Sequence, residues 1–305
     1  MSVPGQPAAA GASDIGTASP AAIGARSDDA KVATKERLAL LKRSKSFLAG
    51  AIIVGFWILC AILGSLVVQD PLASDPINDL IAPSADHWLG TDKLGRDVFA
   101  RVITGARDIL IVAPLAVILA TVVGTALGLV TGYFRGGIDD VLSRIIEAFL
   151  ALPTIIMGLL VAVALGPSRT TLILTIGILF APIISRTVRA AVLTERELEY
   201  VAAARLRNER TPYVLFREIL PNVMGPIIVE FTVRLGYAIF VAAGLSFLGF
   251  GIPPPAPDWG LQVAEHYGVI SGGFWWPVLF PSLAIATLVV GVNLIADGVA
   301  SAFER

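Results

Sequence analysis

The sequence predicts an all-α protein that crosses a membrane with six helices. Hydrophobic residues make up 55% of the 305 residues and charged residues only 15%, whereas a soluble domain usually carries about 25% charged residues. Several apolar runs approach or exceed the roughly 20 residues that a helix needs to cross a bilayer. Turn-forming or charged stretches separate these runs. We therefore expect a multi-pass helical membrane protein.

Residues 1–46 are predicted to form a cytoplasmic tail. Residues 1 to 30 are rich in Ala, Gly, Ser and Pro without periodicity, a composition typical of disorder. Lys and Arg collect between residues 31 and 46, directly before the first apolar run. Basic residues at this place favour a cytoplasmic start. The apolar run does not follow a basic start at the extreme N-terminus, so we predict no secretory signal.

The apolar runs set the predicted spans. Gly124, Gly128 and Gly132 recur every four residues in the second run, a spacing that lets another helix approach closely in lipid, although Gly is also simply common in such helices. Pro153 predicts a kink in the third. The six predicted spans are 47–68, 109–134, 141–165, 170–189, 223–250 and 276–298.

Six spans place both termini and the loop 190–221 on the same side. Most Lys and Arg residues fall on that side, which predicts that it is cytoplasmic. The predicted division is a tail over 1–46, a first transmembrane helix with an extracytoplasmic segment over 47–108, and a core of five helices over 109–305. Four of the five Trp residues fall in or beside the two longer connections, where we expect them at the membrane interface.

The charged segment between the fourth and fifth spans is predicted to form two short helices. Thr194 can cap the first helix, and Glu197 can complete a capping box. Asn208 stands where a left-handed residue ends a helix. Pro212 suits the first turn of a second helix, and Pro221 is expected to end the segment.

This segment resembles the cytoplasmic EAA loop of ABC-importer permeases, whose pattern is EAA, three residues, Gly, nine residues and I-x-LP. The positions that match in register are Ala203, Ala204, Leu220, Pro221 and Asn222. Three positions depart from the pattern: Ala202 replaces Glu, Asn208 replaces Gly, and Glu218 replaces Ile.

Further motifs extend the resemblance over residue 85 to the C-terminus. Residues 87–107 resemble the HPLGTDxLGRDVxSRxxxGAR motif of dipeptide and oligopeptide importer permeases, residues 245–260 their LSFLGLGxxPPxPxWG motif, and residues 295–298 part of their terminal xGDxLRD stretch. The sequence is most similar to the "C"-type permease subunits of these ABC importers. The resemblance implies the type I, methionine-permease-like fold with cytoplasmic coupling helices.

The resemblance also implies partners and a location. The chain would form half of a heterodimeric pore in the cell membrane with a second permease subunit, receive peptides from an extracytoplasmic binding protein, and couple to two cytosolic ATPase subunits. No GxxxxGK[ST] phosphate loop occurs in the sequence, and this loop is what holds the phosphates of ATP. We therefore expect no cofactor in this chain, with ATP and Mg²⁺ bound by the ATPases, and no nucleic-acid partner.

The coupling hypothesis rests on the charged segment. Its first helix presents Leu198, Val201, Ala202 and Arg205 at helical spacing, a narrow face that could enter a groove on an ATPase. The alternative is an ordinary charged loop. The predicted coupling residues are Glu197, Val201, Ala202, Ala203, Ala204, Asn208, Leu220 and Pro221.

Polar residues at membrane depth are candidates for the substrate path, and these are Glu230, Arg234 and Asn293. The alternative is that Glu230 and Arg234, four residues apart, only neutralise each other. His87 and His266 lack the spacing of a metal site.

Two other classes of function compete with the ABC permease. A secondary transporter or channel would show unpaired intramembrane carboxylates and inverted repeats. An intramembrane enzyme would need a nucleophile and base or a metal within the spans. Co-purification of two ATPase subunits would distinguish the ABC permease from both. The cargo stays open among dipeptides, oligopeptides, nickel chelates, haem and glutathione.

Overall fold

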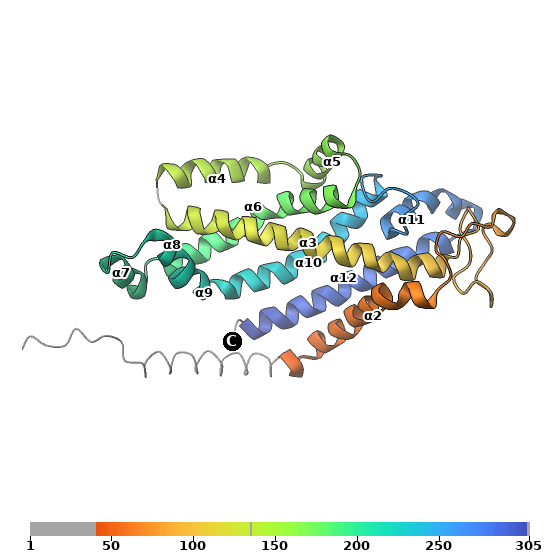
Figure 1. Ribbon diagram of the computed structural model, residues 1–305, viewed down its shortest axis with the longest axis horizontal. Coiled ribbons are helices and arrows are strands. Elements are labelled where there is room, and N and C mark those ends of the chain that lie inside the picture. Colours follow the sequence, from red (N-terminus) through yellow and green to blue (C-terminus); the bar gives the residue numbers. More distant parts are fainter. Residues whose placement is uncertain (1–40, 135, 304–305) are drawn as a thin grey trace, which may run out of the picture.

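The computed structural model describes residues 41–134 and 136–303, which form an elongated bundle of long helices (Figure 1). Five helices in this part of the chain are long and apolar enough to span a membrane. These are α2 (Lys45–Val67), α3 (Val98–Tyr133), α6 (Arg169–Glu195), α10 (Met224–Phe247) and α12 (Trp276–Phe303). The predicted tail lies largely in residues 1–40, outside the described residues.

The third predicted span is broken. In place of one kinked helix over 141–165, α4 (Gly137–Leu150) and α5 (Thr154–Leu165) meet at 93°. Pro153 stands between them, and a proline has no N–H with which to continue a helix. The described residues thus hold five spanning helices, or six if this bent pair counts as one span.

The predicted glycine contact is confirmed between α3 and α6. A methyl group added at Gly128 would lie 2.6 Å from Cβ of Val188, and one added at Gly132 would lie 2.7 Å from Cβ of Val192. Gly124 similarly faces Ile184. Glycine is required here because the two helices approach too closely for a side chain.

The start of α3 and the end of α6 differ from the predicted boundaries, because the capping residues are not the predicted ones. The carboxylate of Asp97 accepts from the Ala100 N–H at 2.8 Å, so α3 begins at Val98 and continues across the predicted boundary at residue 108. The predicted capping box at Thr194 is wrong. Thr194 lies inside α6, which continues to Glu195, and its hydroxyl donates to the Ala190 carbonyl at 3.4 Å.

Loops occupy both ends of the bundle (Figure 1). One end carries the start of α2, the end of α12 and the segment between α6 and α10. The other, which we call the loop end, carries residues 68–97 with η1 (Pro76–Asn78), α11 (Trp259–His266) and η3 (Tyr267–Gly272). The segment resembling the coupling loop is thus on the same side as the first described residues and the end of α12.

Candidate functional site

The segment between α6 and α10 folds into a compact projection that we call the foot, residues 199–222 (Figure 1). It comprises α7 (Glu199–Leu206), α8 (Thr211–Tyr213), the π-helical η2 (Val214–Ile219) and α9 (Leu220–Asn222). Asn208 has φ of +56°, which confirms the predicted left-handed residue. Pro212 lies in the first turn of α8, also as predicted. Pro221, however, lies within α9 and does not end the segment.

The foot is fixed to the ends of α3 and α6. Arg196, directly after α6, donates to the carbonyls of Gly132 and Tyr133 at 3.2 and 2.7 Å. These carbonyls end α3, where a cation is favoured by the helix dipole. The guanidinium of Arg205 on α7 lies 4.9 Å from the centre of the Tyr133 ring, within the range of a cation–π contact. These contacts hold α7 and the connection after α6 against the end of α3.

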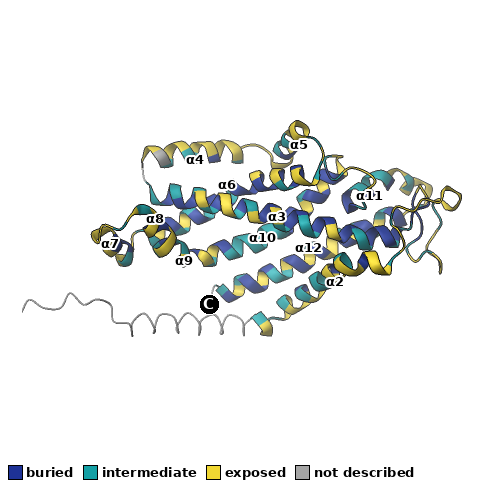
Figure 2. Ribbon diagram, in the orientation of Figure 1, coloured by how far each residue is buried: buried dark blue, intermediate teal, exposed yellow. Residues whose placement is uncertain are grey.

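The predicted docking face of α7 is divided between the interior and the surface. Val201 and Ala204 have no exposed area and form the core of the foot with Val214 and Ile219. Ala202 and Ala203, by contrast, are exposed, as Figure 2 shows for much of the foot. The face through Leu198, Val201, Ala202 and Arg205 is therefore not one exposed surface, because Val201 points inward. Outside that face, Leu206 (84%) and Phe216 (59%) are the most exposed large apolar side chains of the foot.

The remaining predicted coupling residues lie around this core. Glu197 is exposed in the connection from α6, with its carboxylate 3.2 Å from Arg196. Asn208 and Pro221 are exposed and Leu220 is half-buried. Glu218, which departs from the EAA pattern, has its carboxylate 3.4 Å from Arg207. At the position where the pattern has Ile, an ion pair therefore links η2 to the residue that follows α7.

The predicted substrate-path residues separate into two contacts. Arg234 donates to Glu230 at 2.6 Å within α10, and Thr187 of α6 reaches the same carboxylate at 3.4 Å. Asn293 of α12 instead lies against Gly236, where an added methyl group would come 2.4 Å from its amide oxygen. In the described structure Asn293 makes no hydrogen bond to the pair. The predicted local neutralisation of Glu230 by Arg234 is confirmed.

A buried charged cluster at the loop end was not predicted from the sequence. Arg96 donates to Asp92 at 2.6 Å and to Glu265 at 3.0 Å. Arg101, only 1% exposed, lies 3.6 Å from Glu265. The His266 ring lies 3.8 Å from Asp92, and burial lowers its pKa below the usual value. The cluster ties the start of α3 to α11, and its only sequence signal was the repeated charge within residues 87–107.

Tryptophan side chains strengthen the same junction. Trp259 donates to the Val102 carbonyl at 2.8 Å, and Trp276 donates to the Thr91 carbonyl at 3.0 Å. Both are almost fully buried, whereas Trp88 and Trp275 are exposed. Across residues 41–134 and 136–303, no group of three or more His, Cys, Asp or Glu side chains could hold a metal ion.

The long helices with a foot between α6 and α10 define the class of protein. The chain is similar to a chain of the MetNI methionine ABC transporter in inward-facing conformations, with a TM-score of 0.55 and 20% identity, over 67% of this chain and 97% of that one. The fold is thus that of a type I ABC importer permease.

Sequence comparison gives the family. The model of the family described as "Binding-protein-dependent transport system inner membrane component" matches residues 124–305, and the chain belongs to that family. The chain is 40% identical over 271 residues to the dipeptide transport system permease protein DppC of Alkalihalophilus pseudofirmus, covering 88% of this chain and 89% of the relative. It is a permease subunit of an ABC importer and a multi-pass membrane protein.

Other relatives carry related names. The chain is 34% identical over 261 residues to the probable D,D-dipeptide transport system permease protein DdpC of Escherichia coli, covering 85% and 87% of the two chains. It is 37% identical over 232 residues to the glutathione transport system permease protein GsiD of Pectobacterium atrosepticum, covering 75% of each chain.

Proposed function

We propose that this chain forms half of the pore of a peptide importer and receives mechanical work from ATPase subunits through the foot. The observation that carries the proposal is the attachment of the foot. Arg196, in the three-residue connection between α6 and the foot, donates to the last carbonyls of α3, and the Arg205 guanidinium of the foot lies 4.9 Å from the Tyr133 ring. A protein bound at the foot can therefore tilt helices that cross the membrane.

The exposed surface of the foot is suited to a protein partner. Ala202 and Ala203 offer a flat surface without long side chains, and Leu206 and Phe216 supply exposed apolar area beside it. Apolar anchors of this kind are typical of helix-in-groove contacts. Val201 and Ala204 contribute by holding α7 in place, because their side chains pack inside the foot.

The proposal includes the orientation and the partners. The foot, the start of α2 and the end of α12 lie in the cytoplasm, where the basic residues of the sequence gather. A second permease completes the pore, two ATPases bind ATP and Mg²⁺, and a binding protein delivers cargo at the loop end. The names of the relatives support di- or oligopeptides as the cargo.

Ala203→Arg tests the coupling surface, because residue 203 is exposed and its substitution leaves the core of the foot intact. We expect the variant to lose ATPase subunits when the complex is purified through this chain. Ala73→Arg is the matched control, since Ala73 is exposed at the loop end. Equal ATPase recovery with both variants would refute the docking surface.

The cargo is tested separately by uptake of a labelled dipeptide in cells with and without this chain. We expect uptake to require the chain and unlabelled dipeptides to compete. Competition by glutathione but not by dipeptides would overturn dipeptide cargo and leave coupling through the foot unaffected.

A further inference from the structure

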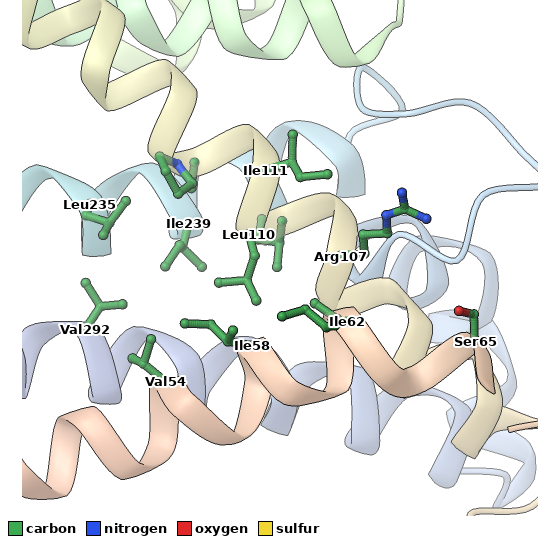
Figure 3. Close-up of a pocket in the computed structure, with 14 residues that line it drawn as sticks. Val54, Ile58, Ile62, Ser65, Arg107, Leu110, Ile111, Leu235, Ile239 and Val292 are labelled. Atoms are coloured by element: carbon green, nitrogen blue, oxygen red, sulfur yellow. The ribbon is translucent and has the colours of Figure 1, made fainter. Parts of the chain in front are cut away.

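An apolar cavity of about 640 Å³ lies between α2, α3, α10 and α12 (Figure 3). Aliphatic side chains make up most of its wall, including Ile58 of α2, Leu110 of α3 and Ile239 of α10. Arg107 and Ser65 both lie toward the same end of the cavity in Figure 3. The cavity is thus apolar along most of its length and polar at the end nearer the loop end.

A second cavity of about 730 Å³ continues from the polar end. It shares Ala61, Ser65 and Arg107 with the first, and Asp108 and Arg169 also line it. The two cavities therefore adjoin at these shared residues, with an aliphatic part between the helices and a charged part beside the loops. A ligand that fills both must have an apolar chain and a polar head.

The charged part is lined by Arg107, Asp70, Asp108 and Arg169, and Asp70 accepts from the Leu72 N–H at 2.9 Å. Arg169 forms an ion pair with Asp108, so these two charges neutralise each other. Arg107 is exposed and makes no hydrogen bond or ion pair with any other described residue. A free guanidinium with five N–H donors is well suited to phosphate oxygens.

The length of the apolar part matches one leaflet of a bilayer. On α2 the lining residues run from Val54 to Ser65, which at about 1.5 Å per residue spans about 16 Å. The hydrocarbon core of a bilayer is about 30 Å thick. An acyl chain that starts at Arg107 would therefore end near Val54, close to the middle of the membrane.

The cavity is separate from the predicted substrate path. Leu235 and Ile239 are one helical turn apart and line it from α10. Glu230 and Arg234 do not line it and pair with each other on another face of the same helix. A ligand in the cavity would wedge α2 against α3, α10 and α12 without occupying the path beside Glu230.

We propose that this space binds a membrane phospholipid from the leaflet at the loop end. Its phosphate contacts Arg107, and one acyl chain lies along Ile58, Ile62 and Leu110. The lipid completes the packing of α2 against the rest of the bundle, since the cavity otherwise leaves aliphatic side chains without contacts on one side.

The test uses the complex isolated through this chain and reconstituted in vesicles of equal parts phosphatidylethanolamine and phosphatidylglycerol. Phospholipid with a nitroxide near the end of one acyl chain reports motionally restricted lipid by electron paramagnetic resonance. We expect a restricted component that Ile58→Trp removes by filling the cavity. Leu59→Trp is the matched control, because Leu59 is 58% exposed and does not line the cavity.

Arg107→Gln tests the headgroup contact. We expect it to lower the affinity for the spin-labelled phospholipid about tenfold, equivalent to about 1.4 kcal/mol. Arg144→Gln, an exposed arginine on α4, should have no effect. The proposal would be overturned if Ile58→Trp and Leu59→Trp removed the restricted component equally. It would also be overturned if neither variant removed it. Cross-linking of Ile62→Cys to a helix of another subunit would show that a protein fills the cavity instead, which would also overturn it.

Discussion

Asp258 should make the stability of the loop end depend on pH. It is 5% exposed and caps α11 by accepting from the Leu261 N–H at 2.9 Å, while Ser246 donates to its other oxygen at 3.2 Å. Burial, only partly offset by these hydrogen bonds, raises its pKa from 3.8 to about 6. We predict that Asp258→Asn stabilises the protein at neutral pH, because Asn keeps the capping oxygen without the buried charge.

The magnitude follows from the pKa difference between the folded and unfolded chain. A carboxyl group with a raised folded pKa stabilises the fold fully below about pH 4, and that contribution is lost as pH rises through about 6. The whole difference is about 3 kcal/mol, of which about 1.4 kcal/mol falls between about pH 5 and about pH 7.5. The advantage of Asp258→Asn should grow by that amount over this interval.

Thermal unfolding of the purified protein at several pH values measures this advantage. For a chain of this size we expect the difference in unfolding midpoint between variant and parent to widen by about 3–6 °C from about pH 5 to about pH 7.5. Asp75→Asn is the control, because Asp75 caps η1 from an exposed position. A gap that narrows with rising pH, or that Asp75→Asn reproduces, would refute the reasoning.

Three further predictions concern helix packing, the buried charged cluster and the attachment of the foot. Gly128→Ala should destabilise the protein by about 1–3 kcal/mol in thermal unfolding, because the added methyl group overlaps α6, whereas Gly55→Ala, with open space around it, should be neutral or stabilising. Asp92→Asn should cost about 3–5 kcal/mol in the same assay, because it removes one of the two carboxylates that neutralise the two buried arginines and leaves only Glu265. A loss below about 0.5 kcal/mol would contradict this. Arg196→Met should uncouple the foot from α3, so that ATPase subunits still co-purify but peptide uptake falls; unchanged uptake would argue against transmission through this residue.

Local sequence signals predicted much of the bundle. The apolar runs located the five long helices, since a bilayer requires about 20 apolar residues whatever the fold. Glu230 and Arg234 pair within one helical turn, so their spacing alone predicts the contact. The glycines of α3 recur every four residues, and this spacing predicts the close approach of another helix. Asn208 was predictable because few residues other than Gly and Asn tolerate a left-handed conformation.

Long-range packing decided the features that were missed. Thr194 carries a good capping signal, but α6 continues past it to Glu195, and the Thr194 hydroxyl bonds back to the Ala190 carbonyl. Helical spacing placed Val201 on one face of α7 without revealing that this face meets the rest of the foot. The charged cluster joins residues more than 150 positions apart along the chain, a pairing that no local pattern reports.

Thiol cross-linking from the tip of the foot tests coupling most directly. With Cys60→Ser as background, Leu206→Cys places a thiol at a position that is 84% exposed on α7, and Ile77→Cys places one at a position that is 91% exposed at the loop end. The account predicts that residue 206 cross-links to an ATPase subunit in membranes and that residue 77 does not. Labelling of residue 206 by a membrane-impermeant maleimide from outside intact cells, with no cross-link to an ATPase, would contradict it.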